Sequence, residues 1–412
     1  MTTTEQSYET APALIDTLRK YQNIASFIGL IFLAFTVAGI FIPGLTSGPN
    51  VTPLQQFFRS YLVGFWYWFG MGAASLLILM TQYMTGGAWG LMIRRPLEAG
   101  AKTLYLFVLG FLPMLVFHDD LYWWSTKEGL ADKVIKAKDL YLNIPFLWIR
   151  WGIYAVFLVV MTYLLTKWSL EEDETKSTKV SSRLETLSGP GIPIFFVLMT
   201  FCSVDYLMTL EPHWYSTVYG FLTIVSWCLT LMCCVVATLT VLAKFPPLDH
   251  ALTEKHLHDL GKLMFALTML WAYLQFSQLL ITWSGNLPEE IVWYIKRWNG
   301  GYGWVSLILL FGLFMLPFLM LLSQSIKKNA KLVARVAIYI MIVRVVDVFV
   351  MVEPNFAKVT DVHFSMSILD ITAPIGFGGL WLALFFRNLQ SGTLLPLGAP
   401  DLKKALSHGK SH

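Results

Sequence analysis

The stretch SVDYLMTLEPHWYST, residues 203–217, places two carboxylates and a histidine in or at the rim of an otherwise apolar segment. They are Asp205, Glu211 and His213. Ionisable side chains inside a bilayer are costly, so they normally face the interior of a helix bundle and mark paths for ions, protons or substrates. The stretch therefore predicts a membrane helix that carries functional side chains toward one of its ends.

A second copy of the pattern occurs later in the chain. Val-Asp, five residues and Glu-Pro recur as VDVFVMVEP at residues 346–354, which contributes Asp347 and Glu353 near the end of another apolar run. Glu-Pro at a helix end is also what helix termination alone predicts, because proline cannot continue the hydrogen-bond ladder. The recurrence therefore indicates either an internal duplication or two independent helix ends.

Composition places the chain in the membrane. Its 412 residues are 56% hydrophobic and 14% charged, whereas a soluble domain carries about 25% charged residues. A net charge of +4, from basic residues scattered between apolar runs, gives no support for nucleic-acid binding. All four cysteines lie in apolar runs without CxxC spacing, which argues against disulfides, zinc or an iron-sulfur cluster held by this chain alone.

Ten apolar runs are long enough to cross the roughly 30 Å hydrocarbon core. Placing the N-terminus inside puts 20 of the 30 Lys and Arg residues on the cytoplasmic side and seven outside, with three in helices. We therefore expect a cytoplasmic arm (1–23), a ten-helix membrane domain (24–387) and a cytoplasmic tail (388–412). The runs lie near residues 24–43, 57–84, 101–117, 143–166, 190–211, 216–243, 260–284, 302–323, 331–352 and 367–387.

The two copies of the motif define the expected architecture. They lie on the fifth and ninth predicted helices, which are four spans apart and so cross the membrane in the same direction. A parallel repeat of this kind predicts an all-α integral membrane protein with two four-helix bundles, helices 2–5 and 6–9. Helices 1 and 10 would flank the bundles.

Two arginines are placed to meet the aspartates. Counting along the helices puts Arg150 at about the depth of Asp205, and Arg344 stands three residues before Asp347, on the same helix face. One interpretation is that these are structural salt bridges between helices. The other is a proton relay, in which Asp205, Glu211, Asp347 and Glu353 titrate in turn. Both can hold together.

The histidines exclude one kind of cofactor and suggest one ligand. None of the eight stands mid-membrane as one of a pair, so no b-type haem site is expected, and we expect no metal on this chain. His118 and Asp119 precede Tyr122, Trp123 and Trp124, a combination that suits a quinol headgroup. The alternative is an interfacial aromatic belt beside a solvated acidic loop.

A glycine-arginine stretch follows the second predicted helix. Residues 85–98 (TGGAWGLMIRRPLE) read as a connection on the inner side, with Arg94 and Arg95 suited to lipid phosphates or to the topology rule. Residues 167–189, which include the acidic run Glu171–Glu174, read as an inner loop of about 20 residues.

The stretches 85–104 (TGGAWGLMIRRPLEAGAKTL) and 204–220 (VDYLMTLEPHWYSTVYG), with the ten-span layout, resemble the ActF-type membrane subunits of bacterial alternative complex III, which belong with the ActC type to the NrfD/PsrC-like family. The resemblance implies a multi-pass subunit of a quinol:cytochrome c oxidoreductase in the bacterial cytoplasmic membrane, with quinol, menaquinol for instance, as substrate.

It further implies that partner subunits, not this chain, hold haem c and iron-sulfur clusters. Those partners would be an ActC-like membrane subunit, an iron-sulfur subunit and cytochrome c subunits, with phospholipids around them. In ActC-like relatives a histidine and an aspartate act in quinol oxidation near the outer face, and His118 with Asp119 is the local counterpart here.

Two hypotheses of function thus stand side by side. The first is a cofactor-free subunit of a redox complex that contributes helix packing, lipid contacts and a proton path. The second is an independent secondary transporter, because transporters also carry repeats and buried charges. Pro113 and Pro317, within predicted helices, fit the second, whereas Pro190, Pro212 and Pro354 stand at helix ends.

Overall fold

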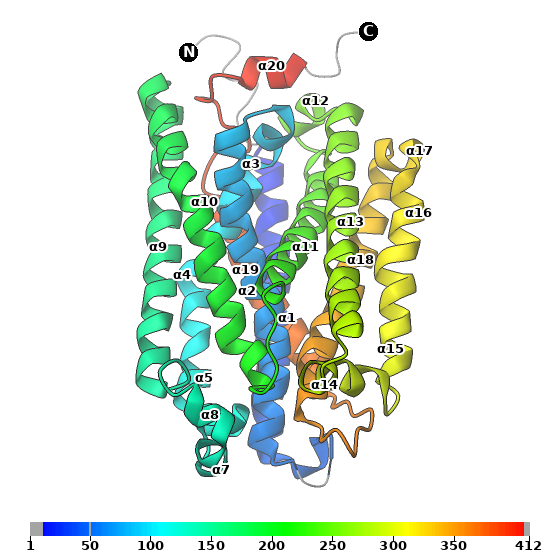
Figure 1. The fold of residues 1–412 in the computed structure, drawn as a ribbon. Helices are drawn as coiled ribbons and strands as arrows, with labels where there is room; N and C mark the ends of the chain where they lie inside the picture. The colour runs from blue at the N-terminus through cyan, green and yellow to red at the C-terminus, as the bar shows by residue number, and fades with distance from the viewer. Residues whose placement is uncertain (1–10, 49–50, 408–412) are drawn as a thin grey trace.

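The computed structural model describes residues 11–48 and 51–407, and within these ranges the chain is helical and forms no strand (Figure 1). The first ten residues of the predicted arm and the last five of the predicted tail lie outside them. The helices are α1 (Pro12–Ala38), α2 (Pro53–Thr85), α3 (Ala88–Ala101), α4 (Leu104–Phe107), α5 (Leu112–Val116), α6 (His118–Leu121), α7 (Lys127–Ala131), α8 (Lys133–Ala137), α9 (Ile144–Thr175), α10 (Thr178–Tyr206), α11 (Tyr219–Leu242), α12 (Leu248–Ala251), α13 (Glu254–Gly285), α14 (Pro288–Trp298), α15 (Tyr302–Leu309), α16 (Leu316–Leu322), α17 (Gln324–Lys328), α18 (Ala330–Val352), α19 (Leu369–Leu389) and α20 (Leu402–Ser407).

The long helices lie side by side and give the molecule two ends (Figure 1). The α20 end carries α20, α12 and α17, and the α14 end carries α14, α7 and α8. Nine spans in the described part of the chain are long and apolar enough to cross a membrane, so the chain is a multi-pass membrane protein. The helix α18, with 23 residues, is not among the nine and carries Arg335, Arg344 and Asp347.

Several boundaries differ from the expected ones. Residues 88–101, expected as a connection, form the helix α3, and α9 and α10 fill most of the expected inner loop, leaving only a turn at Lys176 and Ser177. The third span is interrupted, because α4, a 3₁₀ turn at Val108–Phe111 and α5 follow α3 in place of one regular helix. The helix α1 begins at Pro12, twelve residues before the apolar run that predicted it.

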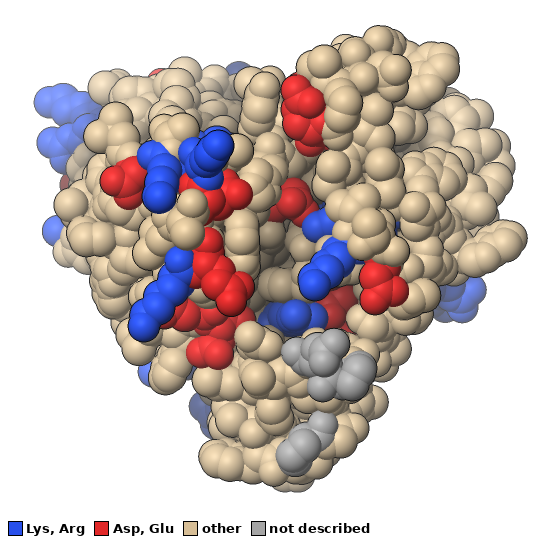
Figure 2. Space-filling view, turned by 60° about the horizontal axis from the view of Figure 1, so that its bottom comes forward, with Lys and Arg blue, Asp and Glu red and all other residues tan. Residues whose placement is uncertain are grey.

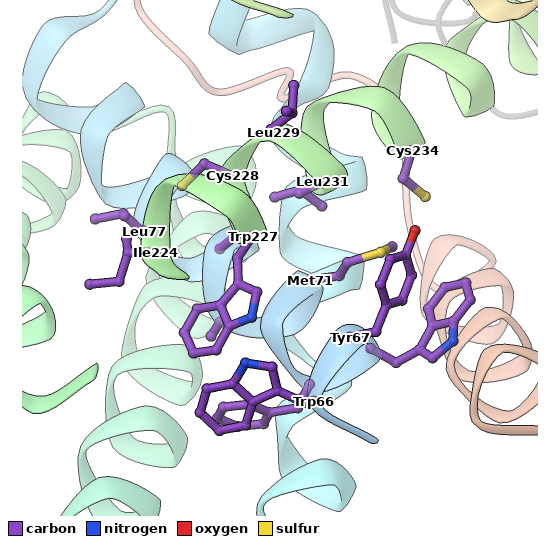
Figure 3. Close-up of a cluster of buried hydrophobic side chains, with 14 of the residues drawn as sticks. Trp66, Tyr67, Met71, Leu77, Ile224, Trp227, Cys228, Leu229, Leu231 and Cys234 are labelled. Atoms are coloured by element: carbon purple, nitrogen blue, oxygen red, sulfur yellow. The ribbon is translucent and has the colours of Figure 1, made fainter. Parts of the chain in front are cut away.

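The helix α2 is the centre of the molecule. It starts with a capping box, in which Thr52 and Gln55 exchange hydrogen bonds, and it packs against α3, α10, α11, α18 and α19. Trp66 of α2 lies against Trp227 of α11, with ring centroids 5.1 Å apart (Figure 3). Gly70 makes room for the Trp227 ring, which a β-carbon at that position would overlap.

Small residues join the first long helix to the last. A β-carbon on Gly379 of α19 would overlap Gly29 of α1 and lie 2.6 Å from the carbonyl oxygen of Ala25. A β-carbon on Gly29 would lie 2.7 Å from the backbone nitrogen of Leu380. Close backbone approach at small residues is the usual basis of helix association in lipid, where apolar side chains gain little by leaving the bilayer.

We expect Gly379→Ala to loosen α1 from α19, because the added methyl group meets backbone and cannot be relieved by a side-chain rotation. Overpacking of this kind costs about 1–3 kcal/mol. The matched control is Gly152→Ala on α9, where nothing lies within 4 Å of the new β-carbon and helix propensity favours alanine. Thermal melts in detergent should show a lower unfolding midpoint than the wild type for Gly379→Ala and not for Gly152→Ala. Equal midpoints for both variants would contradict the close approach of α1 and α19.

Candidate functional site: buried ion pairs at the α14 end

Asp205, the penultimate residue of α10, is buried and held by three side chains. Its carboxylate accepts hydrogen bonds from Arg150 Nε of α9 at 2.8 Å and from the hydroxyls of Tyr141 and Tyr154 at 2.7 Å each. The Arg150 guanidinium also lies 4.0 Å from the Tyr141 ring centroid. The predicted pairing of Arg150 with Asp205 is confirmed.

The second aspartate has a more local partner. Asp347 and Arg344 form an ion pair on α18, as their spacing predicts, and both are buried. Nε of Arg344 also donates to Thr230 Oγ1 of α11 at 3.3 Å. The two copies of the motif therefore differ, because Asp205 ties α10 to α9 whereas Asp347 is neutralised within its own helix.

The two Glu-Pro glutamates each pair with a distant cation. Glu211, which follows α10, forms an ion pair with Lys296 of α14, and Lys296 also donates to the Asn355 carbonyl oxygen at 3.2 Å. Glu353, which follows α18, lies 3.5 Å from Arg59 NH1 of α2. Glu211, from the first copy of the motif, thus contacts the later helix α14. Glu353, from the second copy, contacts the earlier helix α2.

Asp370 is a carboxylate that the sequence pattern did not reveal. It stands in the first turn of α19 and accepts from Ser60 Oγ at 2.5 Å, from Gln56 Nε2 at 3.4 Å and from the Ser367 backbone nitrogen at 2.8 Å. Burial and the charge of Asp370 raise the pKa of Glu353 to about 8. An acidic residue at the start of an apolar run was the only signal for it.

Arg297 is a buried cation in the same region. Its guanidinium lies 3.5 Å from the Trp293 ring centroid and donates to the Met351 carbonyl oxygen at 3.0 Å and to Asn355 Oδ1 at 3.1 Å. No carboxylate within the described ranges forms an ion pair with it. Burial lowers the pKa of Arg297 to about 9. Carbonyl groups and an aromatic face thus take the place of a counter-ion.

The predicted histidine sites lie nearer the surface. His118 Nδ1 is 2.9 Å from Asp119 Oδ1, and the Asp119 side chain is 63% exposed. His213 lies 3.3 Å from Asp132 in the loop region that holds α7 and α8. Figure 2 shows acidic and basic side chains gathered on this face of the molecule. The structure therefore keeps both histidines away from the buried ion pairs of Asp205 and Asp347.

A separate buried network occupies the α20 end. Arg94 contacts Glu172 at 2.5 Å and Glu98 at 3.5 Å, and Arg95 contacts Glu98 at 2.5 Å and also pairs with Asp173. Both arginines are buried, so they do not face lipid phosphates, which corrects the interpretation of this stretch from sequence. The acidic run read as a solvated loop supplies two of their partners.

Two cavities border these groups. The larger, about 1020 Å³, lies between α1, α11, α18 and α19, and Asp370 is its only acidic or basic lining residue. The smaller, about 350 Å³, lies at the α14 end and is lined by Tyr141, Thr209 and Lys138 among others. Tyr141 donates to Asp205, so this cavity reaches one hydrogen bond from the aspartate.

The arrangement at the α14 end suits proton transfer. Two separate groups lie there: Asp205 is hydrogen-bonded to two tyrosine hydroxyls, and Asp370 to Ser60. In an apolar surrounding small changes in charge shift the protonation of such groups. Within residues 11–48 and 51–407 no group of three or more His, Cys, Asp or Glu side chains is placed to hold a metal ion.

The raised pKa of Glu353 predicts a pH dependence of stability. A carboxyl group whose pKa is about 4.5 in the unfolded chain and about 8 in the folded chain binds its proton more tightly when folded. Its contribution to stability is then fully present below about pH 4.5 and is lost as the pH rises through about 8. The midpoint of thermal unfolding should fall more between pH 6 and 9 for the wild type than for Glu353→Gln.

The control for that comparison is Glu185→Gln, which changes an exposed glutamate on α10. It should keep the wild-type pH profile. A Glu353→Gln profile that parallels the wild type across the whole range would show that Glu353 does not titrate there.

Searches for related proteins leave the chain without a demonstrated family. No protein-family model matches the sequence. No curated protein matches it significantly either.

Proposed function

We propose that this chain is an integral membrane subunit of a quinol:cytochrome c oxidoreductase of the alternative complex III type. In this proposal it holds no redox cofactor itself and contributes a proton path. The observation that carries the proposal is the group of buried carboxylates, hydroxyls and cations at the α14 end, because ionisable groups inside a membrane protein commonly mark proton paths. The sequence resemblance described above supplies the kind of complex.

The proposed topology has ten spans, with α18 as the tenth. Its 23 residues suffice to cross the hydrocarbon core, and its charges at Arg344 and Asp347 neutralise each other. The helices α10 and α18 run in the same direction, from the α20 end to the α14 end, which supports a parallel repeat (Figure 1). We place the α20 end in the cytoplasm, in accord with the excess of basic residues in the connections at that end.

The repeat would divide the chain into one bundle from α2 to α10 and another from α11 to α18. The pairs Glu211–Lys296 and Glu353–Arg59 then cross between the bundles. Removing one member of a buried pair typically costs about 3–5 kcal/mol, because the other charge is left unpaired. The crossed pairs would hold the bundles together at the outer face, where a partner subunit with redox centres would dock.

The proposed proton path runs from Asp205 through Tyr141 to the smaller cavity. Tyr141 donates to Asp205 and lines that cavity, and Thr209, which donates to the Asp205 carbonyl oxygen, lines it too. Lys138 forms part of the wall and donates to the Pro212 carbonyl oxygen at 2.7 Å. Asp347, Glu211 and Glu353 would tune or extend this path.

Purification in mild detergent tests the complex directly. We expect a tagged chain to co-purify with c-type haem and iron-sulfur subunits, visible by absorption spectroscopy and subunit analysis. Quinol-dependent cytochrome c reduction should accompany them. A haem-free protein isolated alone, with substrate transport in vesicles, would replace the proposal by an independent secondary transporter.

The proton path predicts a difference between two tyrosines that both bond Asp205. Tyr141→Phe removes the hydroxyl of a residue that lines the smaller cavity, whereas Tyr154→Phe removes the hydroxyl of a residue that does not line it. Both keep the Arg150–Asp205 pair. In the complex reconstituted into vesicles, Tyr141→Phe should lower proton release per electron severalfold while Tyr154→Phe retains it. Equal values for both variants and the wild type would refute the path.

A further inference from the structure

The larger cavity has the shape of a long apolar slot. On α19 its lining runs from Asp370 to Phe386, which is about 24 Å at 1.5 Å per residue. The walls come from α1, α18 and α19 and the floor from Tyr67 of α2 and Cys234 of α11. Its volume of about 1020 Å³ matches that of a large ligand pocket. The slot therefore suits a long, narrow, apolar molecule.

The two ends of the slot differ in charge. Asp370 lies at the α14 end of the lining, hydrogen-bonded to Ser60 and close to Glu353 in the same acidic region. On α18, Lys331 and Arg335 stand seven and three residues before the lining residue Ile338, so they continue the same face toward the α20 end. An anionic group is attracted to the α20 end of the slot, whereas at the other end Glu353 and Asp370 lie in the field of Arg59.

A third cation flanks the slot at its α20 end. Lys20 of α1 directly precedes the lining residue Tyr21. Lys20, Lys331 and Arg335 are all exposed, and among the ion pairs of the described residues none includes any of them. Basic residues between helices beside an apolar slot are the arrangement that binds phosphate headgroups of lipids.

We propose that this slot is a specific site for an anionic phospholipid. The phosphate contacts Lys20, Lys331 and Arg335, and acyl chain extends between α1 and α18 toward Asp370. A neutral amphiphile would leave the three cations without a partner. The inference does not depend on the proposed function.

The ligand would also explain why α1 has two different faces. One face meets α19 through Gly29, whereas the slot face presents Thr17, Tyr21 and Ile28. Between α1 and α18 the protein provides apolar wall on both sides of the opening. Acyl chains in the slot would therefore complete the packing between the first helix and the later bundle.

Native mass spectrometry of delipidated protein tests the proposal. Phosphatidylglycerol and phosphatidylcholine with the same acyl chains are the probes. We expect one phosphatidylglycerol to be retained at concentrations where phosphatidylcholine is lost. Lys331→Ala with Arg335→Ala should weaken phosphatidylglycerol binding about tenfold or more. The matched control, Lys167→Ala with Lys179→Ala, removes two exposed cations from helices that do not line the slot and should leave binding unchanged.

A second variant tests the acyl part of the site. Ala237→Phe places a ring in the slot without changing charge, and it should weaken binding of phosphatidylglycerol while thermal melts confirm a folded protein. Equal binding of the two lipids, or no effect of the double variant at Lys331 and Arg335, would overturn the proposal and favour a neutral amphiphile. Failure to retain any lipid would overturn it in favour of a protein helix as occupant.

Discussion

The structure depends on neutralising charge that is buried in an apolar bundle. A lone charge in such a place is so unfavourable that it must either find a counter-ion or lose its charge. Asp205 solves this with a guanidinium and two hydroxyls, Asp347 with an arginine one turn away, and Arg297 with carbonyl oxygens and an indole face. The helix contacts at the α14 end follow from these choices, because the partners come from different segments.

The two copies of the motif show how one pattern serves two purposes. Asp205 is bound by groups from another helix and a loop beside a cavity, so a change in its protonation is felt by its neighbours and by solvent. Asp347 is enclosed with Arg344 and Thr230, and the preceding residues Val345 and Val346 line the larger cavity. We infer that the first aspartate is the better placed for proton exchange, because Tyr141 joins it to the smaller cavity.

The ion pairs that follow from helix geometry could be predicted from the sequence. Arg150 with Asp205 follows from depth, and Arg344 with Asp347 from spacing on one helix. It missed Lys296 because α14 lies between two spans, where counting depth says nothing about burial. It missed α3 and the helical ends of α9 and α10 because charged and glycine-containing stretches read as solvated.

There the charges of Arg94, Arg95 and Glu172 are paired inside the protein, so helix continues where hydropathy predicts a loop. Length and apolar character report the spans directly: ten were predicted, and nine in the described part of the chain are long and apolar enough to cross a membrane. The ends of the helices depend on ion pairs between residues far apart in the sequence, and such pairs are visible only in the three-dimensional structure.

The seam between Gly29 and Gly379 bears on how the protein is made. The helix α1 packs most extensively against α19, whose residues lie some 350 positions later in the chain. During synthesis α1 is therefore made well before the helix that covers its glycine face. Removing α19 from the chain would leave Gly29 without the backbone contact to Gly379.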